Sequence, residues 1–366
     1  MIKRYADEVS ASEIVAARKH KIKGTSGNDV LVGTDGDDRF ILSYGTDQLV
    51  GGQGGTDSIK FGSLYWTDST TMNWTLTAKG INGTIVTGSS IRTTFFDIDS
   101  ITAKLGSSTD RLNYFVEAVE GRHPVNVRAE IFVQANYLNL VFAESLAAPL
   151  RLNVDANGVH SNVGKFSQFG YFTATGGAGD DQMSSTEYYS VTFTGGAGDD
   201  TLTGGSGNDI LVGGVGEDVL TGGTYNSFPS SVPNTDTFVF AAGDTAADAA
   251  HADLITDFQR SEADRIDLKA YDAIARTVAV DAFTFIGNAA FSGKAGELRS
   301  EFQDGDTLVS GNTNDDRVAD FTIRLTGEIA LTAADFVFAP AAIPAAAAHP
   351  FAAHVEFFGG HALPLA

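Results

Sequence analysis

Large apolar residues recur every nine positions between residues 195 and 221, where Leu202, Leu211 and Leu220 each follow an aspartate by two places. Each leucine is the centre of a three-residue stretch, and the alternation of a β-strand points its side chain to one face. A strand this short cannot bury an apolar face alone, so the copies must stack around their leucines. The pattern predicts an all-β solenoid.

The turn between two such strands has the composition G-G-x-G-x-D. Glycine allows positive φ and lets backbone carbonyls approach one another closely. A carboxylate among backbone carbonyls forms an all-oxygen cage, which suits a hard cation such as Ca²⁺. A flexible linker would not keep leucine and aspartate in phase, and the phosphate-binding pattern G-x-G-x-x-G is absent from the three copies. The turns therefore predict calcium sites.

The same spacing occurs earlier, in GTSGNDVLV and GTDGDDRFI at residues 24–41. Here the glycines are fewer. The aspartate and the following apolar residue pair as Asp29 with Leu31, Asp38 with Phe40, Asp47 with Leu49 and Asp57 with Ile59. Residues 24–60 are thus predicted to be a first repeat block, separate from a second block at residues 176–240.

Residues 61–175 lose the Gly-Asp turns but keep strand-like alternation, as in NWTLTA and LRLNVDA. The segment is predicted to be a degenerate β-solenoid. Asp110 and Leu112 stand 71 positions before Asp181 and Met183 in a similar local sequence, which suggests a longer duplicated unit.

The aromatic residues of the middle segment allow two interpretations, a core of the solenoid or a face on which carbohydrate stacks. They are Trp66, Trp74, Phe95, Phe96, Phe166, Phe169, Tyr171 and Phe172. Its polar candidates for chemistry have no spacing that indicates a reaction, and a solvated face is the simpler reading. They are Asp97, Asp99, Asp110, Glu117, Glu120, His123, Arg128 and Tyr137.

Charge and composition exclude several classes of binding partner and metal site. The chain has 24 basic and 46 acidic residues, a net charge of −22, which argues against nucleic acid and anionic membranes as partners. There is no cysteine, so disulfides and thiolate metal sites are excluded. No uninterrupted apolar stretch approaches the roughly 18 residues of a membrane span. Residues 6–19 are predicted to form a short helix that caps the solenoid.

The nonapeptides resemble the calcium-binding repeats of RTX proteins. The resemblance implies a right-handed parallel β-roll in which two repeats make one coil and calcium lies between turns on the same side. Asp181, Asp200 and Asp218 would then line one column. Asp209 and Asp236 would line the other, with an inserted loop around Phe228 to Pro233 and with Phe238 in the apolar position.

The predicted calcium sites use the aspartates and the second and third glycines of the turns. They are Asp29, Asp38, Asp47, Asp57, Gly177, Gly179, Asp181, Gly196, Gly198, Asp200, Gly205, Gly207, Asp209, Gly214, Gly216, Asp218 and Asp236.

Residues 236–338 are similar to the C-terminal domain of serralysin-type secreted metalloproteases. The matching positions are Asp253, Asp257, Phe258, Asp264, Asp267 and Leu268. The resemblance implies that this domain completes the roll beside an uncleaved export signal for type I secretion, for which residues 325–366 are suitable. Two departures are Glu262, where the family often has glycine, and NTNDDR at 312–317, which argues against a calcium site in that loop.

No H-E-x-x-H zinc motif and no G-x-S-x-G elbow are present, so we predict no catalytic residues. The expected divisions are an N-terminal cap (1–23), the first block (24–60), the degenerate solenoid (61–175), the second block (176–240), the serralysin-like domain (241–338) and an Ala/Pro-rich tail (339–366). The predicted function is that of a secreted protein whose roll folds on extracellular calcium. The expected partners are calcium, a type I exporter and a polysaccharide or cell surface. The alternative is a carbohydrate-active enzyme or polysaccharide-binding module centred on residues 61–175.

Overall fold

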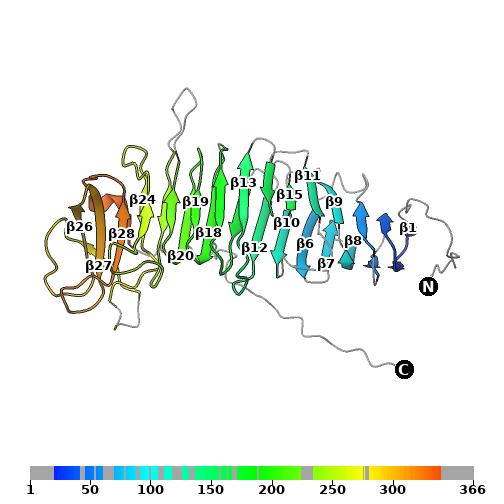
Figure 1. Ribbon diagram of the computed structural model, residues 1–366, viewed down its shortest axis with the longest axis horizontal. Helices are drawn as coiled ribbons and strands as arrows, with labels where there is room; N and C mark the ends of the chain where they lie inside the picture. The colour runs from blue at the N-terminus through cyan, green and yellow to red at the C-terminus, as the bar shows by residue number, and fades with distance from the viewer. Residues whose placement is uncertain are drawn as a thin grey trace.

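The computed structural model is an elongated roll of two β-sheets, with strands crossing its long axis (Figure 1). It describes residues 20–41, 46–52, 55–60, 70–77, 80–87, 91–98, 100–105, 111–117, 126–131, 137–155, 158–162, 164–166, 171–187, 189–223, 234–274, 276 and 280–338. The predicted helix at 6–19 and the predicted insertion around Phe228 to Pro233 lie outside these residues.

Sheet A has 13 strands. In spatial order they are β2 (Val30–Val32), β4 (Gln48–Val50), β8 (Ile91–Ile98), β7 (Gly80–Thr87), β6 (Thr70–Thr77), β10 (Arg111–Val116), β12 (Tyr137–Phe142), β16 (Tyr171–Thr175), β18 (Val191–Ala197), β20 (Ile210–Val215), β22 (Thr237–Val239), β24 (Arg265–Asp267) and β29 (Phe336–Val337).

Sheet B has 16 strands. In spatial order they are β1 (His20–Lys23), β3 (Asp38–Ile41), β5 (Ser58–Lys60), β9 (Ser100–Leu105), β11 (Asn126–Ile131), β15 (Gly164–Phe166), β14 (Gly158–Ser161), β13 (Arg151–Asp155), β17 (Gln182–Ser185), β19 (Thr201–Thr203), β21 (Val219–Thr221), β23 (Asp253–Ile255), β28 (Phe321–Leu325), β27 (Asp306–Asn312), β26 (Glu297–Gln303) and β25 (Thr284–Phe285). One 3₁₀ helix, Ala333–Asp335, precedes β29.

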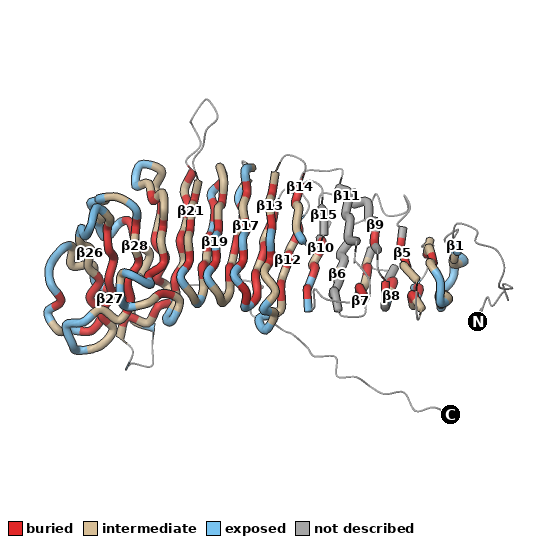
Figure 2. The backbone as a smooth tube through the Cα atoms, in the orientation of Figure 1, coloured by how far each residue is buried: buried red, intermediate tan, exposed pale blue. Residues whose placement is uncertain are grey.

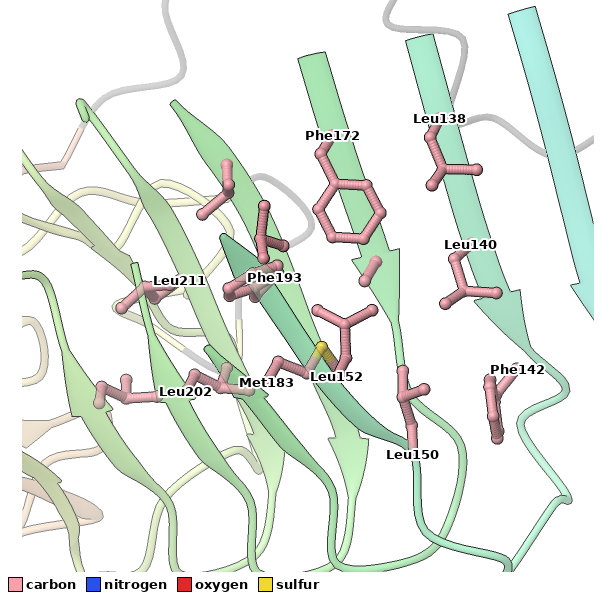
Figure 3. Packing of buried hydrophobic residues seen from close by; sticks show 14 of the residues in the cluster. Leu138, Leu140, Phe142, Leu150, Leu152, Phe172, Met183, Phe193, Leu202 and Leu211 are labelled. Carbon is pink, nitrogen blue, oxygen red and sulfur yellow. The ribbon is translucent and has the colours of Figure 1, made fainter. Parts of the chain in front are cut away.

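Successive strands of the repeat blocks alternate between the two sheets, and each pairs in parallel with the strand one coil away. Leu202 of β19 lies between Met183 of β17 and Leu220 of β21 in the register. All three side chains are buried, and Figure 2 shows buried positions recurring from strand to strand along the described part of the roll. Figure 3 shows Met183 and Leu202 of sheet B in the same core as Phe172 and Phe193 of sheet A. The predicted all-β roll with parallel strands is confirmed.

The middle segment, predicted to be a degenerate β-solenoid, contains two antiparallel meanders. Strands β6, β7 and β8 form an antiparallel meander inside sheet A, and strands β13, β14 and β15 form another inside sheet B. In each case the last strand of the meander joins the preceding coil and the first joins the following coil. The alternation predicted strands here, and the structure adds two antiparallel meanders to the predicted degenerate β-solenoid.

The echo at an offset of 71 residues does not correspond to a repeat of whole coils. Leu112 lies in β10 of sheet A, whereas Met183 lies in β17 of sheet B. Asp110 lies outside the described residues.

The aromatic residues of the middle segment divide between core and surface. Phe95 and Phe172 are fully buried, while Phe96 and Tyr171 are exposed on sheet A, where Tyr171 stacks on Tyr137 at 4.7 Å between ring centroids. Neither interpretation holds for the whole set. Trp66 and Phe169, like Asp99, Glu120 and His123, lie outside the described residues.

The C-terminal end of the roll is closed by strands β25 to β28, which pair in antiparallel fashion from β26 onward. Tyr271, Phe283 and Phe321 pack as an aromatic cluster beneath them. Arg260 bonds both oxygens of the largely buried Asp335 at 2.9 Å and ties the loop after β23 to the final strand. These contacts cover the apolar interior, which an unfinished solenoid would expose.

Candidate calcium sites

The aspartates just before or at the start of strands of sheet B form one column, which we call the sheet B column: Asp181, Asp200, Asp218 and Asp253. Each backbone amide donates to the Oδ1 atom of the aspartate one coil further along the chain. The distances are 2.7 Å from Asp181 to Asp200, 2.8 Å from Asp200 to Asp218 and 3.0 Å from Asp218 to Asp253. The ladder fixes the orientation of each carboxylate and leaves its Oδ2 atom to face the turn.

The sheet A column consists of Asp209, Asp236 and Asp264, which precede strands of sheet A. The amide of Asp209 donates to Oδ1 of Asp236 at 2.9 Å, and the amide of Asp236 donates to Oδ1 of Asp264 at 3.0 Å. Asp209 and Asp236 are thus neighbours, as the resemblance to RTX repeats implied. In the same way Asp181, Asp200 and Asp218 share a column, as predicted.

Two members of the columns, Asp253 and Asp264, were not among the predicted metal-site residues. They follow their column neighbours by 35 and 28 residues, so the nine-residue spacing does not reach them. The available signal was their place in the serralysin-like run, where both had been matched.

The outer oxygens of these carboxylates give a test of whether the turns suit a cation. The Oδ2 atoms of Asp200, Asp209, Asp218 and Asp253 are buried and accept no hydrogen bond from the protein. Leaving a buried carboxylate oxygen without a donor is costly, and native structures rarely do so without a reason. A calcium ion bound by Oδ2 would supply the missing partner, so the residues fit this ion.

The first glycine of each turn is packed against the same oxygen. A methyl group at Gly195 would overlap Oδ2 of Asp200 and the carbonyl oxygen of Gly213, and one at Gly213 would overlap Oδ2 of Asp218. Only glycine lets the carboxylate and a backbone carbonyl of the next coil come together here. These first glycines were not among the predicted site residues, although the repeat contained them.

The glycines predicted as site residues allow the backbone conformation and the close packing of the turn. Gly196 and Gly214 have φ of 117° and 105°, which side-chain-bearing residues rarely adopt. Positive φ also occurs at Gly198, Gly205 and Gly216. Gly177, Gly179 and Gly207 lack positive φ, but a side chain at any of them would crowd the backbone of a neighbouring coil.

Burial raises the pKa of every carboxyl in the two columns, because desolvation disfavours the ionised form, and most of them also lie near other acidic groups that add to the effect. The pKa is about 8 for Asp200, Asp218 and Asp236, about 7 for Asp209 and Asp253, and about 6 for Asp181 and Asp264. The columns therefore resist ionisation unless positive charge compensates it. A bound dication would provide that charge.

The first block has the same ladder with different turns. The amide of Asp29 donates to Oδ1 of Asp47 at 3.1 Å, and that of Asp38 donates to Oδ1 of Asp57 at 3.0 Å. In the turns before Asp29 and Asp38, however, threonine takes the place of the second glycine. The Thr34 amide and hydroxyl donate to Oδ2 of Asp38 at 2.6 and 3.0 Å, and Thr25 does the same for Asp29.

Each turn contributes one carboxylate, so the protein ligands of a site would be mostly backbone carbonyls. In keeping with this, no group of three or more His, Asp or Glu side chains within the described ranges is arranged to hold a metal ion. Such a donor set suits Ca²⁺, which accepts carbonyl oxygens, better than a transition metal.

The loop at 312–320 satisfies its own polar groups. Asn312 and Asn314 accept hydrogen bonds from amides two residues ahead, at 3.0 and 2.9 Å. Both oxygens of Asp320 are bonded within the loop, to Thr313 and Asn314. No buried oxygen of this loop lacks a partner, which is the feature that distinguishes the column turns from it.

The RTX calcium-binding nonapeptide repeat family matches residues 23–56 with four copies. The C-terminal family of M10 serralysin peptidases matches residues 153–338, a longer stretch than the predicted 236–338. No curated protein sequence matches the chain. Among the described residues, no helix is long and apolar enough to cross a membrane.

Three solved structures illustrate the likeness. Two are the AlgE6R2 and AlgE6R3 subunits of the Azotobacter vinelandii mannuronan C5-epimerase, with 28% and 30% identity, covering 46% and 51% of this chain and 92% and 90% of theirs, at TM-scores of 0.32 and 0.31. The third is the extracellular lipase LipA of Serratia marcescens, with 16% identity, covering 88% of this chain and 40% of that chain, at a TM-score of 0.29.

The match over residues 153–338 spans half of the chain and includes both aspartate columns from Asp181 onward. The chain belongs to the M10 serralysin C-terminal family and carries RTX calcium-binding repeats ahead of that region.

Proposed function

We propose that this protein is exported and that its roll folds when it binds extracellular calcium. The observation that carries the proposal is that the buried Oδ2 atoms of four column aspartates, Asp200, Asp209, Asp218 and Asp253, accept no hydrogen bond from the protein. Without calcium, folding must either bury ionised carboxylates or protonate them, both of which cost free energy near neutral pH, and the glycine-rich turns lose entropy on ordering. Each ion that binds only the folded coil shifts the equilibrium toward it.

Circular dichroism with calcium and with chelator tests this proposal. We expect the β-sheet signal and the melting temperature to fall on chelation and to return on adding millimolar calcium. Magnesium should restore them poorly, because it prefers fewer and more rigidly placed ligands. An identical spectrum and melting temperature in both conditions would contradict calcium-driven folding.

Export through a type I system is the second part of the proposal. It rests on membership of the serralysin C-terminal family and on the absence of Lys and Arg after Arg324. We expect deletion of residues 325–366 to abolish appearance in the medium of a host with a matching exporter, and deletion of residues 1–20 to leave it intact. The reverse result would exclude this route.

We propose that the folded roll binds or scaffolds and does not catalyse a reaction. A casein assay with added zinc tests this proposal against a protease function. Proteolysis by a clean preparation would refute the proposal that the roll is not catalytic. A second candidate, a polysaccharide-binding module, is favoured by one observation. The strands of sheet B from β1 to β15 concentrate basic residues in a strongly acidic chain.

A further inference from the structure

Polar side chains replace the third glycine of the repeat turn in the last two coils of the sheet A column. Gly207 stands two residues before Asp209 in the first of these coils, where a methyl group would lie 2.7 Å from the backbone of the preceding coil. In the next two coils the same place is taken by Asn234 and Glu262, each two residues before its column aspartate. These two turns therefore differ in composition from the glycine turns of the second block.

The side-chain amide of Asn234 is buried, and its orientation is fixed by its neighbours. Asn234 is 2% exposed, and its Nδ2 atom donates to the carbonyl oxygen of Gly223 at 2.9 Å and to Oδ2 of Asp236 at 3.3 Å. The opposite orientation would set the amide oxygen against these two acceptors. The remaining atom, Oδ1, is buried and has no hydrogen-bond donor. An amide oxygen buried in this way beside a column carboxylate lacks the partner that buried polar groups normally have.

Glu262 has a second such oxygen in the adjacent coil. Its Oε2 atom is also buried and without a partner. The Thr235 hydroxyl donates to the carbonyl oxygen of Glu262 at 2.8 Å, so the two turns lie side by side. The 28 residues that separate Asp236 from Asp264 also separate Asn234 from Glu262, which places the two side chains at matching positions of neighbouring coils.

The backbone around Glu262 is strained. Ala263 has a φ of 69°, and only one other non-glycine residue in the described part of the chain has a positive φ. The amides of Glu262, Ala263 and Asp264 all donate back into the turn, to carbonyl oxygens of Gln259 and Arg260 at 3.1 to 3.3 Å. Such strain persists where the surrounding structure enforces it, and it is concentrated at functional sites and ligand-binding segments.

Several backbone carbonyls next to these side chains already accept hydrogen bonds. The Arg265 guanidinium donates to the carbonyl oxygens of Ala263 and Asp264, each at 2.8 Å. The carbonyl oxygen of Glu262 is taken by Thr235. A cation in this place would therefore find its free oxygens on side chains, whereas in the glycine turns most ligands would be backbone carbonyls.

The charge around the two turns is negative. Asp257 and Glu262 lie close enough to Asp264 to disfavour its ionised form, and Asp257 has the same effect on Asp236. Four acidic side chains thus lie near one basic side chain, Arg265. Free oxygens in negatively charged surroundings suit a hard cation.

We propose that Asn234, Glu262 and the carboxylate of Asp236 bind a calcium ion through their side chains, and that this site is the tightest of the roll. It has two carboxylates where a glycine turn has one, and calcium affinity rises with the charge of the ligands. The proposal rests on the calcium-driven folding proposed above and adds to it a ligand set and an order in which the sites fill.

The first test titrates calcium into the calcium-free, full-length protein in competition with a chromophoric chelator. Glu262→Gln keeps the size of the side chain and removes its charge, so we expect the tightest ion to bind at least about tenfold more weakly. Glu217→Gln is the matched control, since it removes the same charge from a side chain that is 47% exposed in the turn before Asp218. It should change the affinity of the tightest ion by less than about twofold.

Native mass spectrometry at saturating calcium counts the bound ions. We expect Asn234→Ala/Glu262→Gln to hold one ion fewer than the unchanged protein, and Glu217→Gln to hold the same number. Circular dichroism at the same calcium concentration checks that each variant is folded. Should the double variant fail to fold, Glu262→Gln alone, which preserves the packing, decides the question by its affinity.

An unchanged ion count with an unchanged tightest affinity in a folded double variant would overturn the proposal and assign the two free oxygens to buried water. Equal losses in Glu262→Gln and Glu217→Gln would also overturn it, because net charge alone would then account for the effect. A protein that folds with calcium but keeps its tightest ion in the double variant refutes this inference alone. A fold that chelation leaves unchanged refutes calcium-driven folding, whatever the variants bind.

Discussion

The two repeat blocks share a ladder of aspartates but differ in what faces the outer oxygen of each carboxylate. In the second block, Oδ2 of Asp200 and of Asp218 is buried and has no protein partner. In the first block, Oδ2 of Asp38 accepts two hydrogen bonds from Thr34, which stands where the second block has glycine. The threonine thus supplies hydrogen bonds to a carboxylate oxygen that a bound calcium ion would otherwise coordinate.

The difference shows that the nine-residue period and the affinity for calcium are separate properties. The period sets the ladder, which both blocks have. The residue after the first glycine determines which hydrogen-bond donor or proton calcium must displace from the aspartate carboxylate. In the first block it competes with a threonine, and in the second block it competes with a proton, because the column carboxyls have raised pKa values.

The largest effect we expect is that of pH on the second block. Without calcium, its folded state is most stable below the ordinary aspartate pKa of about 4, and this stability is lost as pH rises through the folded pKa of about 8 for Asp200, Asp218 and Asp236. Calcium binding should strengthen over the same range, by up to about fiftyfold per site between pH 6 and pH 8, with release of protons.

Isothermal titration in two buffers of different ionisation enthalpy measures those protons. Calcium binding at pH 7 without proton release would show that the column carboxyls are already ionised, and would remove the proton as the competing species.

The next effect is that of removing one carboxylate. Asp218→Asn keeps the shape and the Oδ1 acceptor of the ladder but removes the charge, so we expect at least about a tenfold loss of calcium affinity at its turn. Asp38→Asn should cost about threefold or less, since Thr34 already bonds that oxygen. Calcium titrations of both variants, followed by circular dichroism, provide the comparison. Equal losses would mean that the two kinds of turn bind calcium alike.

The smallest effect concerns the threonine itself. Thr34→Gly gives the turn the glycine pair of the second block and frees Oδ2 of Asp38 from the hydroxyl, so calcium affinity of the first block should rise by about threefold. In chelator, the same variant should melt at a slightly lower temperature, since a hydrogen bond is lost and a glycine is gained. Thr34→Ser retains the hydroxyl and serves as the control, with no change expected in either measurement.

The sequence allowed the repeat blocks to be predicted because spacing alone determines which residues stack. Leu202, Leu211 and Leu220 are in phase, which predicts stacking. That two repeats make one coil was implied by the resemblance to RTX repeats and not by the spacing itself. The antiparallel meanders could not be predicted in this way. The alternation of β6 (TTMNWTLT) is the same whether its neighbour runs parallel or antiparallel, and pairing partners are decided by contacts distant in sequence.

The calcium-site residues could be predicted only where the nine-residue repeat continues. Asp253 and Asp264 continue the columns after long connections, so only the family resemblance hinted at them.

The two meanders have a consequence for the curvature of the roll. Each adds two strands to one sheet and none to the other, which alone would lengthen that side by about 10 Å, close to the spacing of packed sheets, and would bend the axis sharply. From β4 to β16, sheet A passes through β8, β7, β6, β10 and β12, and from β5 to β17, sheet B passes through β9, β11, β15, β14 and β13. Both paths contain the same number of strand-to-strand pairings, so the two sheets have equal length over this part of the roll. The meander in sheet B thus compensates for the meander in sheet A, and the axis continues straight into the second block (Figure 1). Deleting either meander alone would bend the axis of the roll, whereas deleting both would only shorten the roll.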